Sequence, residues 1–224
     1  MSKKLNDPQN WDEYWSKKKS KKIYDFIAFY YRNLLIRPSL DYHINKFFKN
    51  NSLILHAGCG GGQVDANIIK TMNIHALDIS SNALKIYENN NPKVSKLFHS
   101  SIFDTGFEDN KYDGIYNLGV LEHFEMNDIN MILNEFKRIL KSNGKILLFW
   151  PHKYGISVMF LKLVVKIFKI LFNKKLNLHP KEITYIYSKK QIKKILENNG
   201  FRLQYYYFGI RDLFTQVVIV AEIK

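Results

Sequence analysis

The feature that most constrains the fold is a glycine-rich turn directly after a short apolar run, Leu53–Leu55. A pattern with helical spacing follows from about Val64. Glycine is needed where a backbone takes positive φ or approaches a ligand closely. A helix N-terminus adds free N–H groups and a partial positive charge. We predict a strand, a tight turn and a helix that together hold the polar part of a ligand. The glycines of the turn are Gly58, Gly60, Gly61 and Gly62.

The nature of that ligand follows from two further positions. A dinucleotide fingerprint, G-x-G-x-x-G, would need a glycine where Gln63 stands. Asp78 ends the next predicted strand, 20 residues after Gly58. At this spacing a carboxylate binds ribose hydroxyls in α/β sheets. The pair predicts a nucleoside ligand and does not require a pyrophosphate.

Strand and helix patterns alternate from residue 52 onward. This alternation predicts an α/β fold: a Rossmann-like, doubly wound, mostly parallel seven-stranded sheet with an antiparallel C-terminal hairpin. The predicted strands are 53–57, 74–78, 94–99, 112–118, 145–150, 201–208 and 215–223. The predicted helices are 63–71, 81–90 after a cap at Ser80 or Ser81, 127–140 with a stop at 142–144, and 188–198 after a cap at Ser188.

Two helical parts surround this core. Residues 1–50 form an aromatic N-terminal cover, with helices around 11–15, over 23–36 and from Pro38 to Phe48. They cover one edge of the sheet, and we expect them also to shape a pocket for a second substrate beside the nucleoside.

Residues 51–224 form the main domain, with a helical lid insertion at about 152–187. Its long apolar helix over 155–172 carries a lysine stripe that argues against a membrane span. It is a lid or packing element, a peripheral membrane contact through 156–172, or a dimer seam. The lysines of the stripe are Lys162, Lys166 and Lys169.

Composition narrows the class of protein further. Apolar residues make up 46% of the chain, which is ample for a core. The single cysteine, Cys59, rules out an intramolecular disulfide and a cysteine-based zinc site. Its small size explains its place in the turn. The net charge of +14 comes from scattered lysines. This pattern favours an anionic membrane surface or an acidic substrate over nucleic acid. The N-terminus has no signal-peptide pattern, so we expect a cytoplasmic protein, with peripheral membrane contact left open.

Four motifs in this order resemble the class I S-adenosylmethionine-dependent methyltransferases, in the small-molecule, type 11-like subgroup. The resemblance covers about residues 52–151. The motifs are Ile54-Leu-His-Ala-Gly-Cys-Gly-Gly-Gly62, Asp78 in Ala-Leu-Asp-Ile-Ser, Phe107-Glu-Asp-Asn-Lys-Tyr-Asp113 followed by Gly119-Val-Leu-Glu-His123, and Phe136-Lys-Arg-Ile-Leu-Lys-Ser-Asn-Gly-Lys145.

The resemblance implies S-adenosyl-L-methionine as the cofactor. The turn backbone would meet its methionine half, and Asp78 would accept both ribose hydroxyls. Ile79 would pack on adenine, whose edge meets the backbone at Ser101–Ile102. Leu118 and Gly119 would line the methionine side. The cofactor-binding residues expected in full are His56, Gly58, Cys59, Gly60, Gly62, Gln63, Asp78, Ile79, Ser101, Ile102, Leu118 and Gly119.

Two positions depart from the family pattern. The family usually has an acid where His56 stands, near the cofactor's ammonium group, and often has one at Ser101. A histidine cannot supply a fixed negative charge. A catalytically weak cofactor-binding protein, or a membrane-associated protein on the same fold, is therefore kept as an alternative.

Methyl transfer from a sulfonium is an in-line displacement, so the protein mainly aligns the reactants and excludes water. A hydroxyl acceptor also needs its proton removed, and histidine is the commonest base. Three histidines stand near the predicted carboxyl edge of the sheet: His152 first, then His179, and His123. Glu122 and His123 have a structural reading as well, as supports at the floor of the site. No metal site is expected.

These observations predict O-methylation of a small-molecule, sugar, glycan or lipid-precursor hydroxyl. N-methylation is the alternative within the enzyme class. No Asn/Asp-Pro-Pro-Tyr/Phe motif follows the fourth predicted strand, which disfavours amino-nitrogen methylation of a base. The sequence leaves the oligomeric state open.

Overall fold

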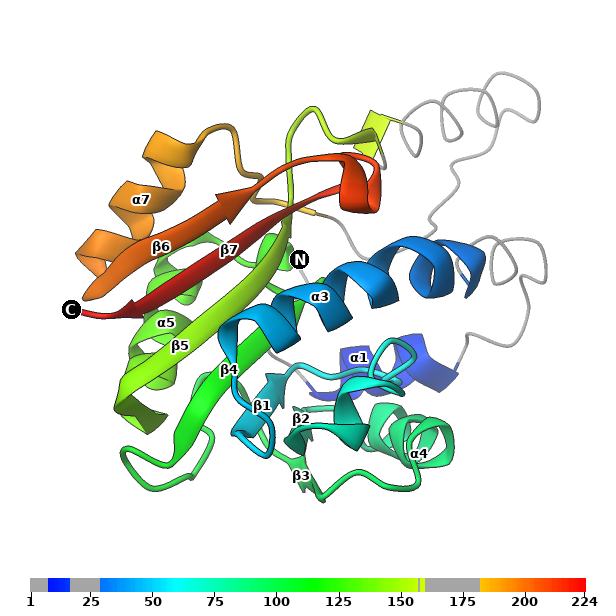
Figure 1. Cartoon of the computed structure of the whole chain (residues 1–224). Coiled ribbons are helices and arrows are strands. Elements are labelled where there is room, and N and C mark those ends of the chain that lie inside the picture. Colours follow the sequence, from blue (N-terminus) through cyan, green and yellow to red (C-terminus); the bar gives the residue numbers. More distant parts are fainter. Residues whose placement is uncertain (1–7, 17–28, 157, 160–181) are drawn as a thin grey trace, which may run out of the picture.

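The computed structural model describes residues 8–16, 29–156, 158–159 and 182–224, and its centre is a seven-stranded sheet (Figure 1). The strand order is β3-β2-β1-β4-β5-β7-β6. All neighbours from β3 to β5 pair in parallel, whereas β7 is antiparallel to both β5 and β6. The predicted fold class is confirmed. The strands are β1 (Leu53–Ala57), β2 (Asn73–Asp78), β3 (Lys96–His99), β4 (Tyr112–Leu118), β5 (Leu140–Pro151), β6 (Phe201–Tyr207) and β7 (Gln216–Ile223).

Helices cover both faces of the sheet (Figure 1). On one face, Phe136 of α5 and Leu196 of α7 pack against the apolar side chains of β5 and β7. On the other face, Leu40 of α3 lies in a buried cluster with apolar side chains of β1, β2, β4, β5 and β7, and Tyr87 of α4 packs with Ala76 of β2. Strands covered on both faces read as near-continuous apolar runs, as the central strands do here. The helices are α1 (Pro8–Ser16), α3 (Arg37–Phe47), α4 (Ser81–Asn90), α5 (Met126–Ile139) and α7 (Lys189–Asn198).

The helix before β1 is continuous through Pro38. A π-helical turn, η2 (Arg32–Ile36), leads directly into α3, and the Arg37 N–H donates to the Arg32 carbonyl five residues back. Proline lacks an N–H and its ring crowds the carbonyl four residues earlier, so a wider turn relieves the contact. The two helices predicted over 23–36 and 38–48 are thus one in the described residues.

The predicted helix over 63–71 is wrong. The chain makes turns there and one short 3₁₀-helix, η3 (Ile68–Lys70). Asp65 and Asn67 explain the difference, because their side chains are used elsewhere. The Asp65 side chain is fully buried in a hydrogen-bonded cluster, and the Asn67 amide donates to Asp41. The expected helix N-terminus after the glycine turn is therefore absent.

The predicted boundary between α5 and β5 is also wrong. The helix ends at Ile139 and the strand begins at Leu140, before the stop predicted at 142–144. A register shift follows, because Tyr112 pairs with Leu140 whereas Gly114 pairs with Lys145. The extra residues form an irregularity at the start of β5. The caps predicted at Ser80 and Ser188 are confirmed, since each accepts a backbone N–H three residues later.

Most of the predicted lid helix lies outside the described residues, and its three lysines do too. Ile156, Val158 and Met159 are described and helical. Within the described ranges, no helix combines the length and apolar character that a membrane span needs.

Candidate active site

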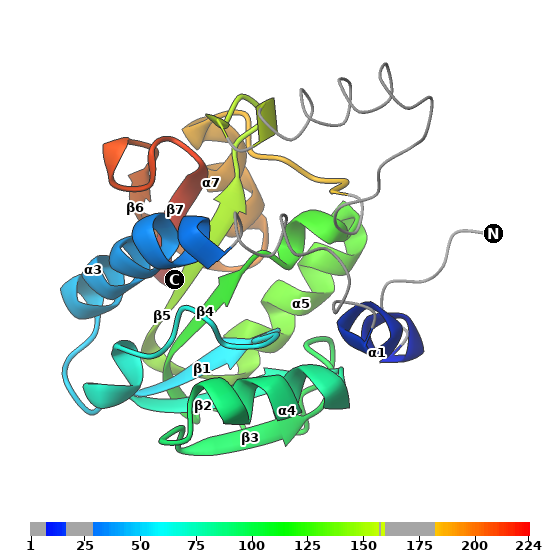
Figure 2. The same cartoon turned by 90° about the vertical axis from the view of Figure 1, so that its right-hand side faces the viewer.

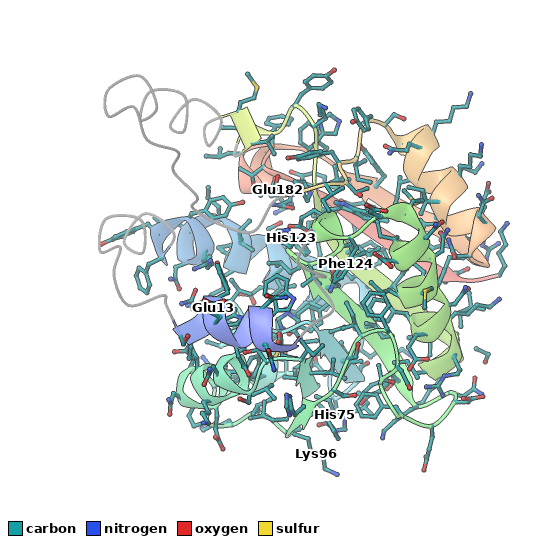
Figure 3. The ribbon with its side chains drawn as sticks, turned by 180° about the vertical axis from the view of Figure 1, so that it is seen from behind. Glu13, His75, Lys96, His123, Phe124 and Glu182 are labelled. Carbon is teal, nitrogen blue, oxygen red and sulfur yellow. The ribbon has the colours of Figure 1, made fainter. Side chains whose placement is uncertain are left out.

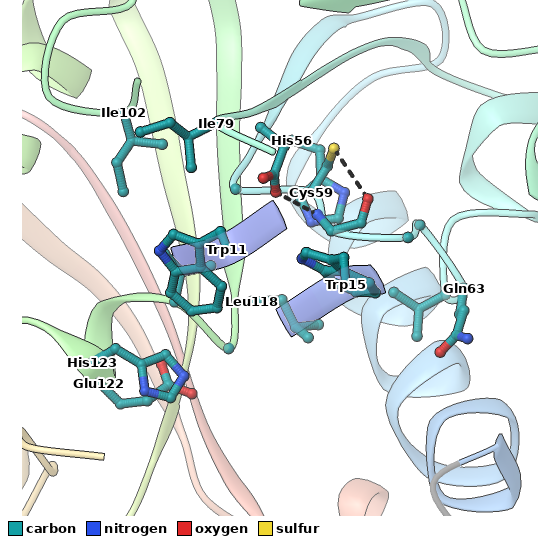
Figure 4. A pocket seen from close by; sticks show the side chains of 18 of the residues that line it. Trp11, Trp15, His56, Cys59, Gln63, Ile79, Ile102, Leu118, Glu122 and His123 are labelled. Atoms are coloured by element: carbon teal, nitrogen blue, oxygen red, sulfur yellow. Dashed lines mark hydrogen bonds between the residues drawn. The ribbon is translucent and has the colours of Figure 1, made fainter. Parts of the chain in front are cut away.

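One cavity of about 310 Å³ opens at the carboxyl ends of β1, β2 and β4 (Figure 4). Ligands bind at this edge in open α/β sheets. Every residue that the sequence predicted for the cofactor lines this cavity. Further lining residues come from α1 and from the 3₁₀-helix η4 (Leu121–His123).

The glycine turn forms the floor of the cavity and is fixed to β2. The N–H groups of Gly58 and Cys59 both donate to the Leu77 carbonyl, at 2.8 and 2.9 Å. Gly62 has a φ of +60°, and a Cβ there would lie 2.3 Å from a ring carbon of Tyr87. Only glycine fits a backbone that is both left-handed and this close to a buried ring. Burial raises the pKa of the Cys59 thiol well above its ordinary value, which agrees with the small-size reading of this residue.

Asp78 presents a buried carboxylate to the cavity beside this turn. Its Oδ2 accepts the Gly60 N–H at 2.8 Å, and its Oδ1 accepts the Ser80 N–H at 2.9 Å. Burial raises the pKa of Asp78, and the two N–H donors oppose that shift. A carboxylate oxygen accepts more than one hydrogen bond. Each oxygen thus keeps capacity for a ligand hydroxyl, and the carboxylate fits a ribose.

Helix α1 covers the glycine turn. The ring of Trp15 lies so close that a Cβ on Gly60 would meet it at 2.7 Å. Asp12 fixes the helix, because its Oδ1 accepts the Ser80 hydroxyl at 2.5 Å and the Asn82 N–H at 3.2 Å. Figure 4 shows the rings of Trp11 and Trp15 across the cavity. The spacing of four between the two tryptophans was the sequence signal for this face.

Glu122 stands at the other end of the cavity. Its side chain is buried, and its Oε2 has no hydrogen-bond partner among the described residues. Burial raises the pKa of Glu122 to about 8, and the nearby Glu182 carboxylate adds to the shift. A perturbed carboxyl in a cavity indicates a functional residue. The sequence reading placed Glu122 among structural supports and did not weigh it as a base.

The three candidate histidines are placed differently. His123 lines the cavity, and its ring lies 5.9 Å from that of Trp11. Figure 3 shows it near Glu182, which lines the same cavity. His152 does not line the cavity. Its ring stacks on that of Phe208, with the ring centroids 4.3 Å apart. This position gives no support to its role as the first candidate base. His179 lies outside the described residues.

The two departures from the family pattern have structural counterparts. His56 Nδ1 lies 2.6 Å from Oδ2 of Asp65, and both side chains are buried. A buried carboxylate therefore lies directly behind the position where the family has its acid. The Ser101 hydroxyl accepts the Phe103 N–H at 3.2 Å and shapes the adenine side of the cavity. Sequence reasoning missed Asp65 because the segment was read as a helix.

A cationic side chain borders the turn as well. Arg32 lines the cavity and donates to the Gln63 side chain at 2.7 Å, and Arg37 donates to the Gln63 carbonyl at 2.6 Å. The helix before β1 is thereby joined to the glycine turn. A positive group within the lining gives the cavity a site for a carboxylate.

The model of a methyltransferase domain matches residues 55–148 of this chain. The match contains the glycine turn, Asp78, Glu122 and most of the sheet. It confirms the resemblance to class I methyltransferases.

An uncharacterised protein of Methanocaldococcus jannaschii is 37% identical to the chain over 101 residues. The aligned segment covers 44% of this chain and 40% of that protein, so the chain spans less than half of its relative's length. The relative therefore has further sequence outside the aligned segment.

Solved structures share the fold. The magnesium protoporphyrin IX methyltransferase of Synechocystis, with bound S-adenosylmethionine, has a TM-score of 0.66 at 14% identity and covers 100% of both chains. The 1,6-didemethyltoxoflavin-N1-methyltransferase of Burkholderia thailandensis, with bound S-adenosylhomocysteine, also reaches 0.66, at 12% identity, covering 100% of this chain and 93% of its own. A methyltransferase of Methanosarcina mazei has a TM-score of 0.62 at 17% identity, covering 80% and 95%. At these identities the likeness shows the fold.

Proposed function

We propose that this chain transfers a methyl group from S-adenosylmethionine to a hydroxyl of a small molecule, sugar, glycan or lipid precursor. One observation carries the proposal: a single cavity holds both a ribose-type carboxylate, Asp78, and a buried carboxyl, Glu122, whose Oε2 has no hydrogen-bond partner among the described residues. The first suits the nucleoside of the cofactor, and the second suits the proton of an acceptor. The methyltransferase domain supplies the frame for both.

The residues present fit the cofactor. The glycine turn puts bare backbone at the cavity wall, because a Cβ at Gly58 or Gly60 would collide with Val120 or Trp15, and the Asp78 oxygens have capacity for two hydroxyls. Ile79 and Ile102 give apolar contact for a base, and Arg32 offers a charge for a carboxylate. The cavity volume lies at the lower end of the range for ligand sites.

Glu122 is the proton acceptor in this proposal. When bound, S-adenosylmethionine would supply a methyl group on a positively charged sulfur, which would keep the bonding electrons as the methyl leaves. The ionised Glu122 carboxylate would accept the proton of the acceptor hydroxyl. Burial makes Glu122 a stronger base than an exposed glutamate. Trp11 and Trp15 of α1 exclude water from the cavity.

The test uses methyl-labelled S-adenosylmethionine with panels of hydroxylated sugars, lipid precursors, phenols and amines. Mass spectrometry of the labelled products identifies the modified atom. We expect label on oxygen, and turnover lowered by about 10²-fold or more in Glu122→Gln. The control is Glu125→Gln, on an exposed residue that does not line the cavity. Equal turnover in Glu122→Gln and the wild type would remove Glu122 from this role.

N-methylation is the second candidate, and the same carboxyl favours it. A buried carboxylate attracts an acceptor ammonium and then accepts its proton. The Burkholderia neighbour is named as an N1-methyltransferase. Label found on amine products alone would replace the hydroxyl proposal by this one.

A further inference from the structure

We infer that His56 and Asp65 act as one unit that binds the ammonium group at the methionine end of the cofactor, with His56 Nε2 as the direct contact. The inference rests on the proposed function and assigns a positioning role within it. It explains how the chain does without the acid that the family has at position 56.

The first step concerns the geometry of the pair. Asp65 Oδ2 lies 2.6 Å from His56 Nδ1, and the Tyr87 hydroxyl donates to the same oxygen at 2.5 Å. Burial and the Asp65 carboxylate raise the pKa of Tyr87, so its hydroxyl stays protonated and donates. The His56 ring also stacks on Tyr116, with centroids 4.1 Å apart. The imidazole is held by contacts on its face and at one nitrogen.

The second step concerns charge. The side chain of Asp65 is fully buried, and no lysine or arginine of the described residues forms an ion pair with it. His56 is its one basic partner among the described residues, and a buried carboxylate is costly unless a positive group lies near it. A cationic ligand group in the cavity would offset that cost through the imidazole. The cavity is thus prepared for a positive group at this point.

The third step concerns direction. Asp65 Oδ2 lies at hydrogen-bond distance from His56 Nδ1, so the tautomer that carries its proton on Nδ1 donates to Asp65 and presents Nε2 to the cavity as an acceptor. Nε2 has no hydrogen-bond partner among the described residues, and His56 lines the cavity two residues before Gly58. An ammonium N–H at the glycine turn would donate to this nitrogen. The charge of Asp65 strengthens that hydrogen bond, as a carboxylate does behind a catalytic histidine.

Calorimetric titration with three ligands tests the inference on the full chain. The ligands are S-adenosylhomocysteine, its deaminated analogue, in which hydrogen replaces the ammonium, and 5′-methylthioadenosine, which lacks the amino acid altogether. The variants are His56→Phe, which keeps an aromatic ring without the acceptor, and Asp65→Asn. A double variant, His56→Phe/Asp65→Asn, removes the acceptor and the buried charge together. It is included because His56→Phe alone would leave the Asp65 carboxylate buried without its histidine partner, which could disturb folding.

We expect the wild type to bind S-adenosylhomocysteine at least about tenfold more tightly than the deaminated analogue, the effect of a charge-assisted hydrogen bond. His56→Phe and the double variant should bind these two ligands with equal affinity, and Asp65→Asn, which keeps the His56 acceptor, should discriminate between them less than the wild type does. Affinity for 5′-methylthioadenosine should stay the same in all proteins, which also shows that they are folded.

Unchanged discrimination between the two ligands in His56→Phe and in the double variant would overturn the inference. So would loss of all three ligands to the same degree, which would indicate a structural role. A wild type that binds none of the three would refute the proposed function itself. The failures of the two proposals are therefore distinguishable.

Discussion

Glu122 illustrates how much a single buried group determines at the residue scale. Its carboxyl has a pKa of about 8 because burial disfavours the charge, against an ordinary value of 4.5. In the unfolded chain the Glu122 carboxyl is exposed to water, and its pKa lies near that ordinary value. Stability from the protonated carboxyl is therefore fully present below pH 4.5 and is lost as the pH rises toward 8. The buried Glu122 carboxyl therefore lowers the stability of the folded chain as the pH rises from 4.5 to 8.

Glu122→Gln should remove this pH dependence. The variant should be more stable than the wild type at pH 8, with a margin that shrinks by about 1.4 kcal/mol per pH unit on lowering the pH toward 5. Thermal unfolding of both proteins over this range measures the margin. A constant difference at all pH values would show that Glu122 ionises in the folded chain as it does in water.

Gly62→Ala should destabilise the chain by more than Gly106→Ala. Both glycines have positive φ, +60° and +70°, so both variants lose about 1–2 kcal/mol from the backbone. Only at Gly62 does the new Cβ meet a buried ring, that of Tyr87, at 2.3 Å, whereas at Gly106 nothing lies within 4 Å. Overpacking adds about 1–3 kcal/mol at Gly62. Urea unfolding compares the two, and equal losses would mean that the turn relaxes freely.

The glycine turn and Asp78 could be predicted from their spacing in the sequence. They stand at the ends of β1 and β2, two strands that are consecutive in the chain and adjacent in the sheet. The partnership of His56 with Asp65 could not. It depends on how residues 63–71 fold, and the side-chain hydrogen bonds of Asp65 and Asn67 replaced the helix that the apolar pattern predicted. The role of Glu122 depends on burial, which a lone glutamate in a sequence does not reveal.

At the element scale, α1 is held over the cavity mainly by polar contacts. Asp12 accepts from Ser80 and Asn82, at the N-terminus of α4, where a carboxylate is favourable. The aromatic surplus of the N-terminal segment was visible in the sequence. Its position over the glycine turn was not, because the contact joins residues about 70 positions apart.

Asp12→Ala should loosen α1 without unfolding the sheet. Trp11 and Trp15 should become more accessible, so acrylamide should quench tryptophan fluorescence more strongly. The third tryptophan, Trp150, is fully buried and gives a constant background. Ser16→Ala is the control, because among the described residues its hydroxyl donates only within α1, to the Glu13 carbonyl. Quenching equal to that of the control would contradict a fixing role for Asp12.

At the scale of the whole molecule, the sheet sets where the chemistry occurs. The carboxyl ends of β1, β2 and β4 meet at one edge, which α1 borders (Figure 2). Asp78 and Glu122 follow two of these strands, and α1 and Arg32 complete the lining of the cavity. Alternation of strands and helices was enough to predict this sheet. The one reversed strand, β7, lies between β5 and β6 and leaves the cavity edge unchanged.

The central claim is that this edge binds the nucleoside of S-adenosylmethionine through Asp78. Calorimetric titration of S-adenosylhomocysteine into the wild type, Asp78→Asn and Asp109→Asn tests it most directly, since Asp109 is exposed and pairs only with Arg138. The wild type and Asp109→Asn should bind equally, and Asp78→Asn should bind at least about tenfold more weakly. No binding by the wild type at about millimolar ligand, or equal affinity for Asp78→Asn, would contradict the claim.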